Sequence, residues 1–108
     1  MAQAQTRILS VEEVRKAIDQ DSSYPLHDLE DLADDATSFI SRRTGYDKWG
    51  EEKNLTAKHC AKLYVRQSYY GKDGYNPEYD YSFGIQADLD DLKDELRKRG
   101  VNTNAGQN

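Results

Sequence analysis

Residues Asn54 to Gly71, with the sequence NLTAKHCAKLYVRQSYYG, decide how the rest of this chain is organised. Small and apolar side chains recur there with the period of an α-helix and gather on one face. That face consists of Ala57, Cys60, Ala61, Tyr64, Val65 and Ser68. Asn54 can cap the first turn, and Gly71 can adopt the left-handed conformation that ends a helix. The stretch predicts a central helix that a neighbouring helix can approach closely.

The opposite face of this central helix carries a basic stripe, made of Lys58, Lys62 and Arg66 at intervals of four residues. Most exposed charges of this kind only keep a helix face in solvent. A stripe of one charge can also meet an acidic surface on another chain. The sequence alone leaves both interpretations open.

Before the central helix, two further helices are predicted. Ser10 and Glu13 form a capping box, and Leu9 can pack on Val14 as a hydrophobic staple, so a short helix should run from Val11 to Ile18. This helix is too short to be stable alone and must dock on another element.

A long helix should follow Pro25, from Leu26 to about Arg43, and should stop at Gly45. Its apolar face is Leu29, Leu32, Ala33, Ala36, Phe39 and Ile40. Its acidic face is Asp28, Glu30, Asp31, Asp34 and Asp35. These carboxylates lie near the N-terminus and Arg42 and Arg43 near the C-terminus, as the helix dipole favours.

Aromatic residues mark both loops beside the central helix. Trp49 lies in the loop from Tyr46 to Lys53, where it can close the base of the core or serve as an interface anchor. The loop from Lys72 to Gly84 has almost no aliphatic residues but carries Tyr75, Tyr79, Tyr81 and Phe83. These four side chains must lie over the helices or against a second chain.

The last predicted helix runs from Ile85 to about Arg99 and ends at Gly100. Its apolar residues form a narrow seam at spacings of four, three and four residues: Ile85, Leu89, Leu92 and Leu96. A seam this narrow fits a groove or a single partner helix. Residues 1–7 and 101–108 are polar and should be flexible outside an assembly.

The 108 residues suffice for one domain, predicted over residues 8–100 as an all-α bundle of about four helices. The net charge of −5 and the isoelectric point near 4.9 argue against a protein that grips phosphate backbones. Cys60 is the single cysteine, so a reduced, buried thiol in a cytosolic protein is expected. No apolar run is long enough to span a membrane.

No motif for catalysis occurs in the sequence, and His27 and His59 are far apart in it. The aspartates of the long helix lack the loop geometry that calcium prefers. We therefore expect no enzyme activity, no cofactor and no metal. The many opposite charges and the clustered tyrosines favour protein assembly instead.

Three stretches carry a resemblance to a known family: residues 9–14 (LSVEEV), 36–45 (ATSFISRRTG) and 85–96 (IQADLDDLKDEL). Their order resembles the small helical head-tail connector, or adaptor, proteins of long-tailed double-stranded DNA phages. The resemblance implies a virion protein of the phage neck that forms a ring, generally twelvefold, between the portal and the stopper or tail. DNA would pass through the ring without specific binding, and an acidic channel wall would repel its phosphates.

Candidate contacts follow from these charges and from the resemblance. Contacts between subunits are expected to join the basic stripe to the acidic helix through Lys58, Lys62, Arg66, Asp31, Asp34 and Asp35. Contacts with the portal or another neck protein are expected from the aromatic loop and the last helix through Tyr75, Tyr79, Tyr81, Phe83, Leu89, Leu92, Leu96, Arg97 and Arg99. The alternative is an acidic soluble regulator, such as a DNA-mimic inhibitor or an antitoxin-like protein, that binds through residues 28–35.

Overall fold

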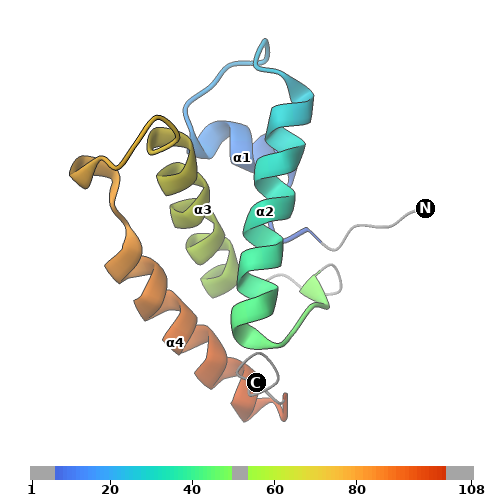
Figure 1. The fold of residues 1–108 in the computed structure, drawn as a ribbon. Helices are drawn as coiled ribbons and strands as arrows, with labels where there is room; N and C mark the ends of the chain where they lie inside the picture. Colours follow the sequence, from blue (N-terminus) through green and yellow to red (C-terminus); the bar gives the residue numbers. More distant parts are fainter. Residues whose placement is uncertain (1–6, 50–53, 102–108) are drawn as a thin grey trace.

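The structure, a computed structural model, describes residues 7–49 and 54–101 and contains four α-helices there. The helices are α1 (Val11–Ala17), α2 (Leu26–Thr44), α3 (Leu55–Tyr70) and α4 (Ser82–Lys98), with the 3-10 turn η2 (Pro77–Tyr79) before α4. Successive long helices run antiparallel, and α1 packs on α2 and α3 (Figure 1). No strand occurs in the described ranges, so the predicted all-α fold of four helices is confirmed. None of the helices described combines the length and apolar character needed to cross a bilayer.

The helix starts use the caps that the sequence indicates. The Glu13 N–H donates to Ser10 Oγ at 3.1 Å and the Ser10 N–H donates to Glu13 Oε1 at 2.9 Å, which completes the capping box. The Ala57 N–H donates to Asn54 Oδ1 at 2.9 Å. At the end of α2, Gly45 has the expected left-handed conformation, with φ of 74°.

Gly71 does not adopt the left-handed conformation predicted for it, since its φ is −101°. The reason for glycine there is a close approach, because its N–H donates to the Gln67 carbonyl at 2.9 Å. A Cβ at position 71 would also lie 2.9 Å from that carbonyl oxygen, closer than side chains tolerate. The position therefore requires glycine for space and not for a positive φ.

The core lies along α3, where small buried side chains allow α2 and α4 to approach. α3 contributes Ala57, Cys60, Ala61 and Val65, and α2 contributes Leu29, Ala33, Ala36 and Ile40. Burial in this core raises the pKa of the Cys60 thiol to about 12, so the thiol stays protonated.

Trp49 belongs to the same core, with 3% of its surface exposed. Its indole N–H donates to Ser41 Oγ at 2.9 Å, and its ring meets Tyr46 edge to face at 4.7 Å. Of the two roles considered for Trp49, the structure shows the one in the core. Residues 50–53 of the predicted loop lie outside the described residues.

The seam of α4 is also part of the core, because Leu89, Leu92 and Leu96 are at most 2% exposed. The expectation that these three leucines contact the portal is therefore wrong for this conformation. A narrow stripe needs only one partner helix, and α3 of the same chain supplies it. α4 also begins at Ser82, three residues earlier than predicted, where the Ser82 N–H donates to Asp80 Oδ1 at 3.0 Å.

The ends of the described chain are tied to the bundle. Arg7 Nε donates to Asp34 Oδ1 at 2.7 Å, and the Val101 N–H donates to the Leu96 carbonyl at 2.9 Å. The rest of the predicted arm and tail, residues 1–6 and 102–108, lies outside the described residues.

Candidate interaction surface

Two of the three side chains of the basic stripe on α3 form hydrogen bonds within the chain. Lys58 Nζ donates to both carboxylate oxygens of Glu13, at 2.7 and 2.9 Å. Arg66 donates to the Ala17 carbonyl at 3.0 Å. Only Lys62 is an exposed member of the stripe. Lys58 and Arg66 thus hold α1 against α3, and the expected subunit contact through them stays a prediction.

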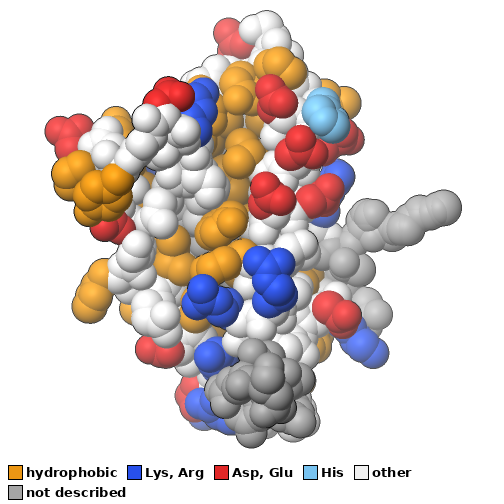
Figure 2. Space-filling view, viewed as in Figure 1, with side chains coloured by type: hydrophobic (Ala, Val, Ile, Leu, Met, Phe, Trp, Pro, Cys, Tyr) orange, Lys and Arg blue, Asp and Glu red, His pale blue; other side chains and the backbone are white. Residues whose placement is uncertain are grey.

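The acidic face of α2 remains on the surface. The side chains of Asp31 and Asp34 are 61% and 58% exposed, and Asp35 is exposed as well. Asp34 pairs with Arg7, whereas Asp31 lies 3.4 Å from His27. Figure 2 shows acidic side chains gathered over the upper half of α2 and basic ones near its lower end. One helix thus presents both signs of charge at separate places.

Two residues of the aromatic loop are ordered by their own chain. Tyr79 stacks on Tyr70 with ring centroids 4.4 Å apart. The Tyr81 N–H donates to Gln67 Oε1 at 2.6 Å, and Arg66 donates to the Tyr81 hydroxyl at 3.4 Å. Tyr79 and Tyr81 thus do not need a second chain for their order, contrary to expectation. The sequence could not choose between these cases because both bury the same tyrosine rings.

Tyr75 and Phe83, by contrast, have 78% and 91% of their surfaces exposed. The Tyr75 hydroxyl donates to Asp80 Oδ2 at 2.8 Å, while Phe83 projects from the first turn of α4. Leaving a phenylalanine ring in water forfeits about 2 kcal/mol of burial energy. Of the four aromatic residues of the loop, Tyr75 and Phe83 are therefore the two that the fold leaves exposed.

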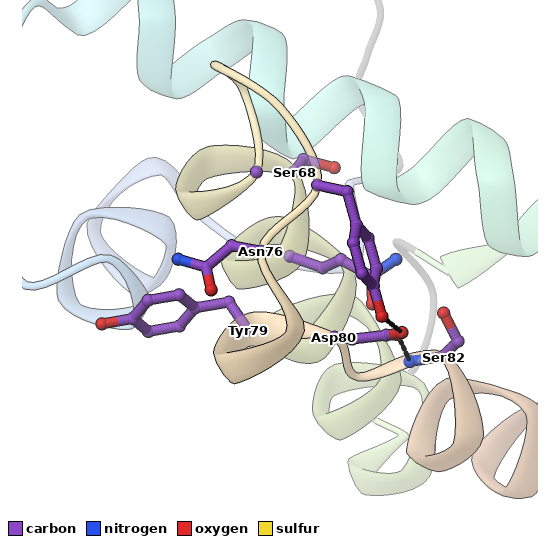
Figure 3. A pocket seen from close by; sticks show the side chains of 8 residues that line it. Ser68, Asn76, Tyr79, Asp80 and Ser82 are labelled. Atoms are coloured by element: carbon purple, nitrogen blue, oxygen red, sulfur yellow. Dashed lines mark hydrogen bonds between the residues drawn. The ribbon is translucent and has the colours of Figure 1, made fainter.

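A first groove of about 290 Å³ lies between the end of α3, η2 and the start of α4 (Figure 3). It is lined by Gln67, Ser68, Gly71, Tyr75, Asn76, Tyr79, Asp80 and Ser82. The hydrogen bonds from Ser82 and Tyr75 lower the pKa of Asp80, so its carboxylate stays ionised at neutral pH. The groove thus combines the rings of Tyr75 and Tyr79 with polar side chains such as Asn76 and Asp80.

A second groove of about 250 Å³ lies where α2, α3 and α4 meet. Its aromatic wall is Phe39 stacked on Tyr64, with ring centroids 4.5 Å apart. The Arg43 guanidinium carbon lies 4.7 Å from the centre of the Phe39 ring, and the far wall includes Ile85 and Leu89. We call this the central groove.

The central groove was not foreseen from the sequence. Phe39 and Tyr64 were predicted on apolar helix faces, yet both are only partly buried. Their position at the edge of those faces is the signal that could have shown it, because an edge residue covers the core with one side only. Gln67 and Ser82 line both grooves, so the two grooves adjoin at the start of α4.

The basic end of α4 carries the remaining candidates, Arg97 and Arg99, both exposed. Arg97 lies 3.9 Å from Asp94, and the Arg99 guanidinium lies 5.9 Å from the Tyr46 ring. Nothing in this geometry tests their predicted contact with a portal. In the described part of the chain, no three side chains of His, Cys, Asp or Glu are placed to hold a metal ion.

Comparison with known proteins adds no relative. No family model, curated protein or solved structure matches this chain. The observed helices agree with the fold that the phage-connector resemblance implies, but four-helix folds serve many functions. The resemblance therefore stays a prediction.

Proposed function

We propose that this protein is a non-enzymatic ring subunit of the neck of a long-tailed double-stranded DNA phage. It joins the portal to the stopper or tail and surrounds the channel through which DNA passes. The proposal combines the resemblance of the three sequence stretches with the surfaces described above.

The exposed aromatic surface at the start of α4 carries the proposal. Phe83 and Tyr75 lie in water although the chain has a complete core of its own. Exposed aromatics beside a groove are typical of protein interfaces, whose centres are enriched in such residues. A structural subunit needs surfaces of this kind, and it needs no catalytic group.

The charge distribution supports the same function. The acidic half of α2 presents Asp28, Asp31 and Asp35 to solvent on a chain with net charge −5. Facing a channel, these carboxylates repel DNA phosphates, so the genome slides without binding. Arg97 at the basic end of α4 and the adjoining Arg99 would then face an acidic surface on the portal.

Assembly in the presence of the portal tests the proposal. The purified chain is mixed with the portal protein of the same genome and examined by sedimentation velocity and negative-stain electron microscopy. We expect rings, either at raised protein concentration or on the portal. A chain that stays monomeric in both conditions contradicts the proposal.

One observation favours a second function, an acidic regulator that binds a basic protein. The exposed carboxylates of α2 form a continuous surface over residues 28–35 that could imitate the charge of DNA. Affinity capture from infected or lysogenic cells separates the two functions. Capsid and tail proteins among the captured partners support the ring, whereas a nuclease or polymerase supports the regulator.

A further inference from the structure

We propose that Phe83 of one copy of this chain inserts into the central groove of the next copy. The inference rests on the proposed ring and names the contact that closes it. It follows from the exposure of Phe83, the shape and charge of the groove, and the placement of both around α4.

The central groove has the size and lining for one aromatic ring. A cavity of about 150 Å³ can hold benzene, and the groove has about 250 Å³. The stacked rings of Phe39 and Tyr64 are only partly buried, so their uncovered parts face the groove, whereas Ile85 and Leu89 in its lining are at most 5% exposed. A phenylalanine entering the groove beside this stacked pair can make the offset or edge-on ring contacts that aromatic pairs prefer.

Phe83 cannot fill the groove of its own chain. The groove is lined by Ser82, Ile85, Gln86 and Leu89, which share one face of α4. Each residue of an α-helix is rotated by about 100° from the one before it, so Phe83 projects to the side of that face. With 91% of its surface exposed, Phe83 needs another chain for burial.

The charges of the two surfaces are complementary. On the side of α4 that carries Phe83, the exposed Asp90 follows seven residues later, about two helical turns on. Arg43 is the one charged residue lining the groove, and Arg42 beside it is exposed. Docking therefore brings a carboxylate beside Phe83 to a basic rim, and the attraction between these opposite charges favours this orientation of the two copies.

Phe83, which we call the knob, and the central groove lie on different sides of α4. In the ring proposed above, each contact between neighbours uses the knob of one copy and the groove of the next, so a pair of copies leaves one knob and one groove free. Such a heterologous contact adds further copies until the rotation closes a ring. A symmetric dimer would instead use both knobs and both grooves at once.

Complementary variants of the full chain test this contact by sedimentation velocity. Phe83→Asp removes the knob, and Gln86→Trp blocks the groove with a bulky side chain at an exposed helix position. Arg43→Glu is a second groove variant, used if Gln86→Trp melts abnormally. Leu55→Asp is the control, since Leu55 is 79% exposed outside both surfaces.

We expect wild type and Leu55→Asp to assemble, and each knob or groove variant to associate at least about 30-fold more weakly, as for an interface hot spot. Phe83→Asp keeps an intact groove and a groove variant keeps an intact Phe83, so an equimolar mixture of the two should give dimers but no larger species. Assembly of Phe83→Asp at wild-type strength, loss of assembly in Leu55→Asp, or absence of mixed dimers overturns the contact and leaves the ring standing. If wild type itself never assembles, with or without portal, the ring and the contact both fail.

Discussion

Lys58 and Lys62 are chemically identical residues one turn apart on α3, and their surroundings make their roles different. Lys58 Nζ binds the Glu13 carboxylate at 2.7 Å, and both side chains are largely covered, at 24% and 32% exposed. Burial opposes the ionisation of Glu13, but hydrogen bonds from Lys58 and Ser10 outweigh it and lower the pKa of Glu13. Lys62 is exposed. Lys58, like Arg66, thus holds α1 against α3, whereas Lys62 stays on the surface.

We predict that Lys58→Gln lowers the free energy of unfolding by about 1 kcal/mol near neutral pH, as for a partly covered charged hydrogen bond. The folded pKa of Glu13 lies below its ordinary value of 4.5, so the contribution is complete above that value and is lost as pH falls through the folded pKa. Urea unfolding at neutral pH and at a series of pH values below 4.5 should show the cost of Lys58→Gln declining as the pH falls. Lys62→Gln is the matched control, and equal costs for the two substitutions would contradict the prediction.

Among the helices, α4 departs furthest from its expected role. It was expected to stand apart as a docking element, yet its seam packs on α3 with Ile85, Leu89, Leu92 and Leu96 buried. Its outer side keeps the exposed Phe83 and the carboxylates. One helix therefore completes the core with one face and presents the candidate contact with another.

We predict that Leu92→Ala lowers the free energy of unfolding by about 2–5 kcal/mol, because it leaves a cavity at a fully buried site. The free energy of unfolding of a domain of this size is only about 5–15 kcal/mol in total.

Truncation after Phe83 removes nearly all of α4 and exposes the face of α3 that it covers, so it should abolish cooperative unfolding. Thermal and urea denaturation measure both effects, with Asp91→Ala on the exposed side as control. A truncated chain that still melts cooperatively would show that α4 is dispensable for the core.

The acidic surface of α2 and the exposed aromatic surface lie at different places on the molecule. Carboxylates cover the first half of α2 (Figure 2), whereas the central groove and Phe83 lie around the start of α4. In a ring closed through α4, the acidic helix is free to face the channel. Under the proposed function, ring assembly and the passage of DNA would therefore involve different parts of one small chain.

We predict that the assembled wild-type ring does not retain double-stranded DNA, even at low ionic strength, where attraction between opposite charges is strongest. Replacing Asp28, Asp31 and Asp35 by lysine should create binding that weakens as salt increases. Fluorescence anisotropy with a labelled duplex measures this, and lysine at Glu12, Asp21 and Asp47, which are exposed outside both α2 and the proposed contact, serves as a control of equal charge change. DNA binding by the wild-type ring would show that α2 does not form a repelling channel wall.

Local patterns in the sequence were enough to predict the four helices and most of the residues at which they begin and end. Ser10 with Glu13, and Asn54, cap helices because the bonds involved join residues three apart, so no distant contact is needed. The apolar period likewise located the buried faces of α2, α3 and α4. Even the extra turn of α4 depends on a local bond between Asp80 and Ser82, which was overlooked.

By itself, then, the sequence determined the all-α class, the four helices and the residues able to be buried, since propensity, capping and period are properties of neighbouring residues. Tertiary structure alone decided which partner each face meets. It placed Lys58 on Glu13, 45 residues away, Tyr79 on Tyr70, and the α4 seam on α3. It also left Phe83 beside an open groove. The charge or apolar character of a side chain indicates only that it will be more stable with a partner. Whether that partner comes from the same chain is determined by how distant segments pack together.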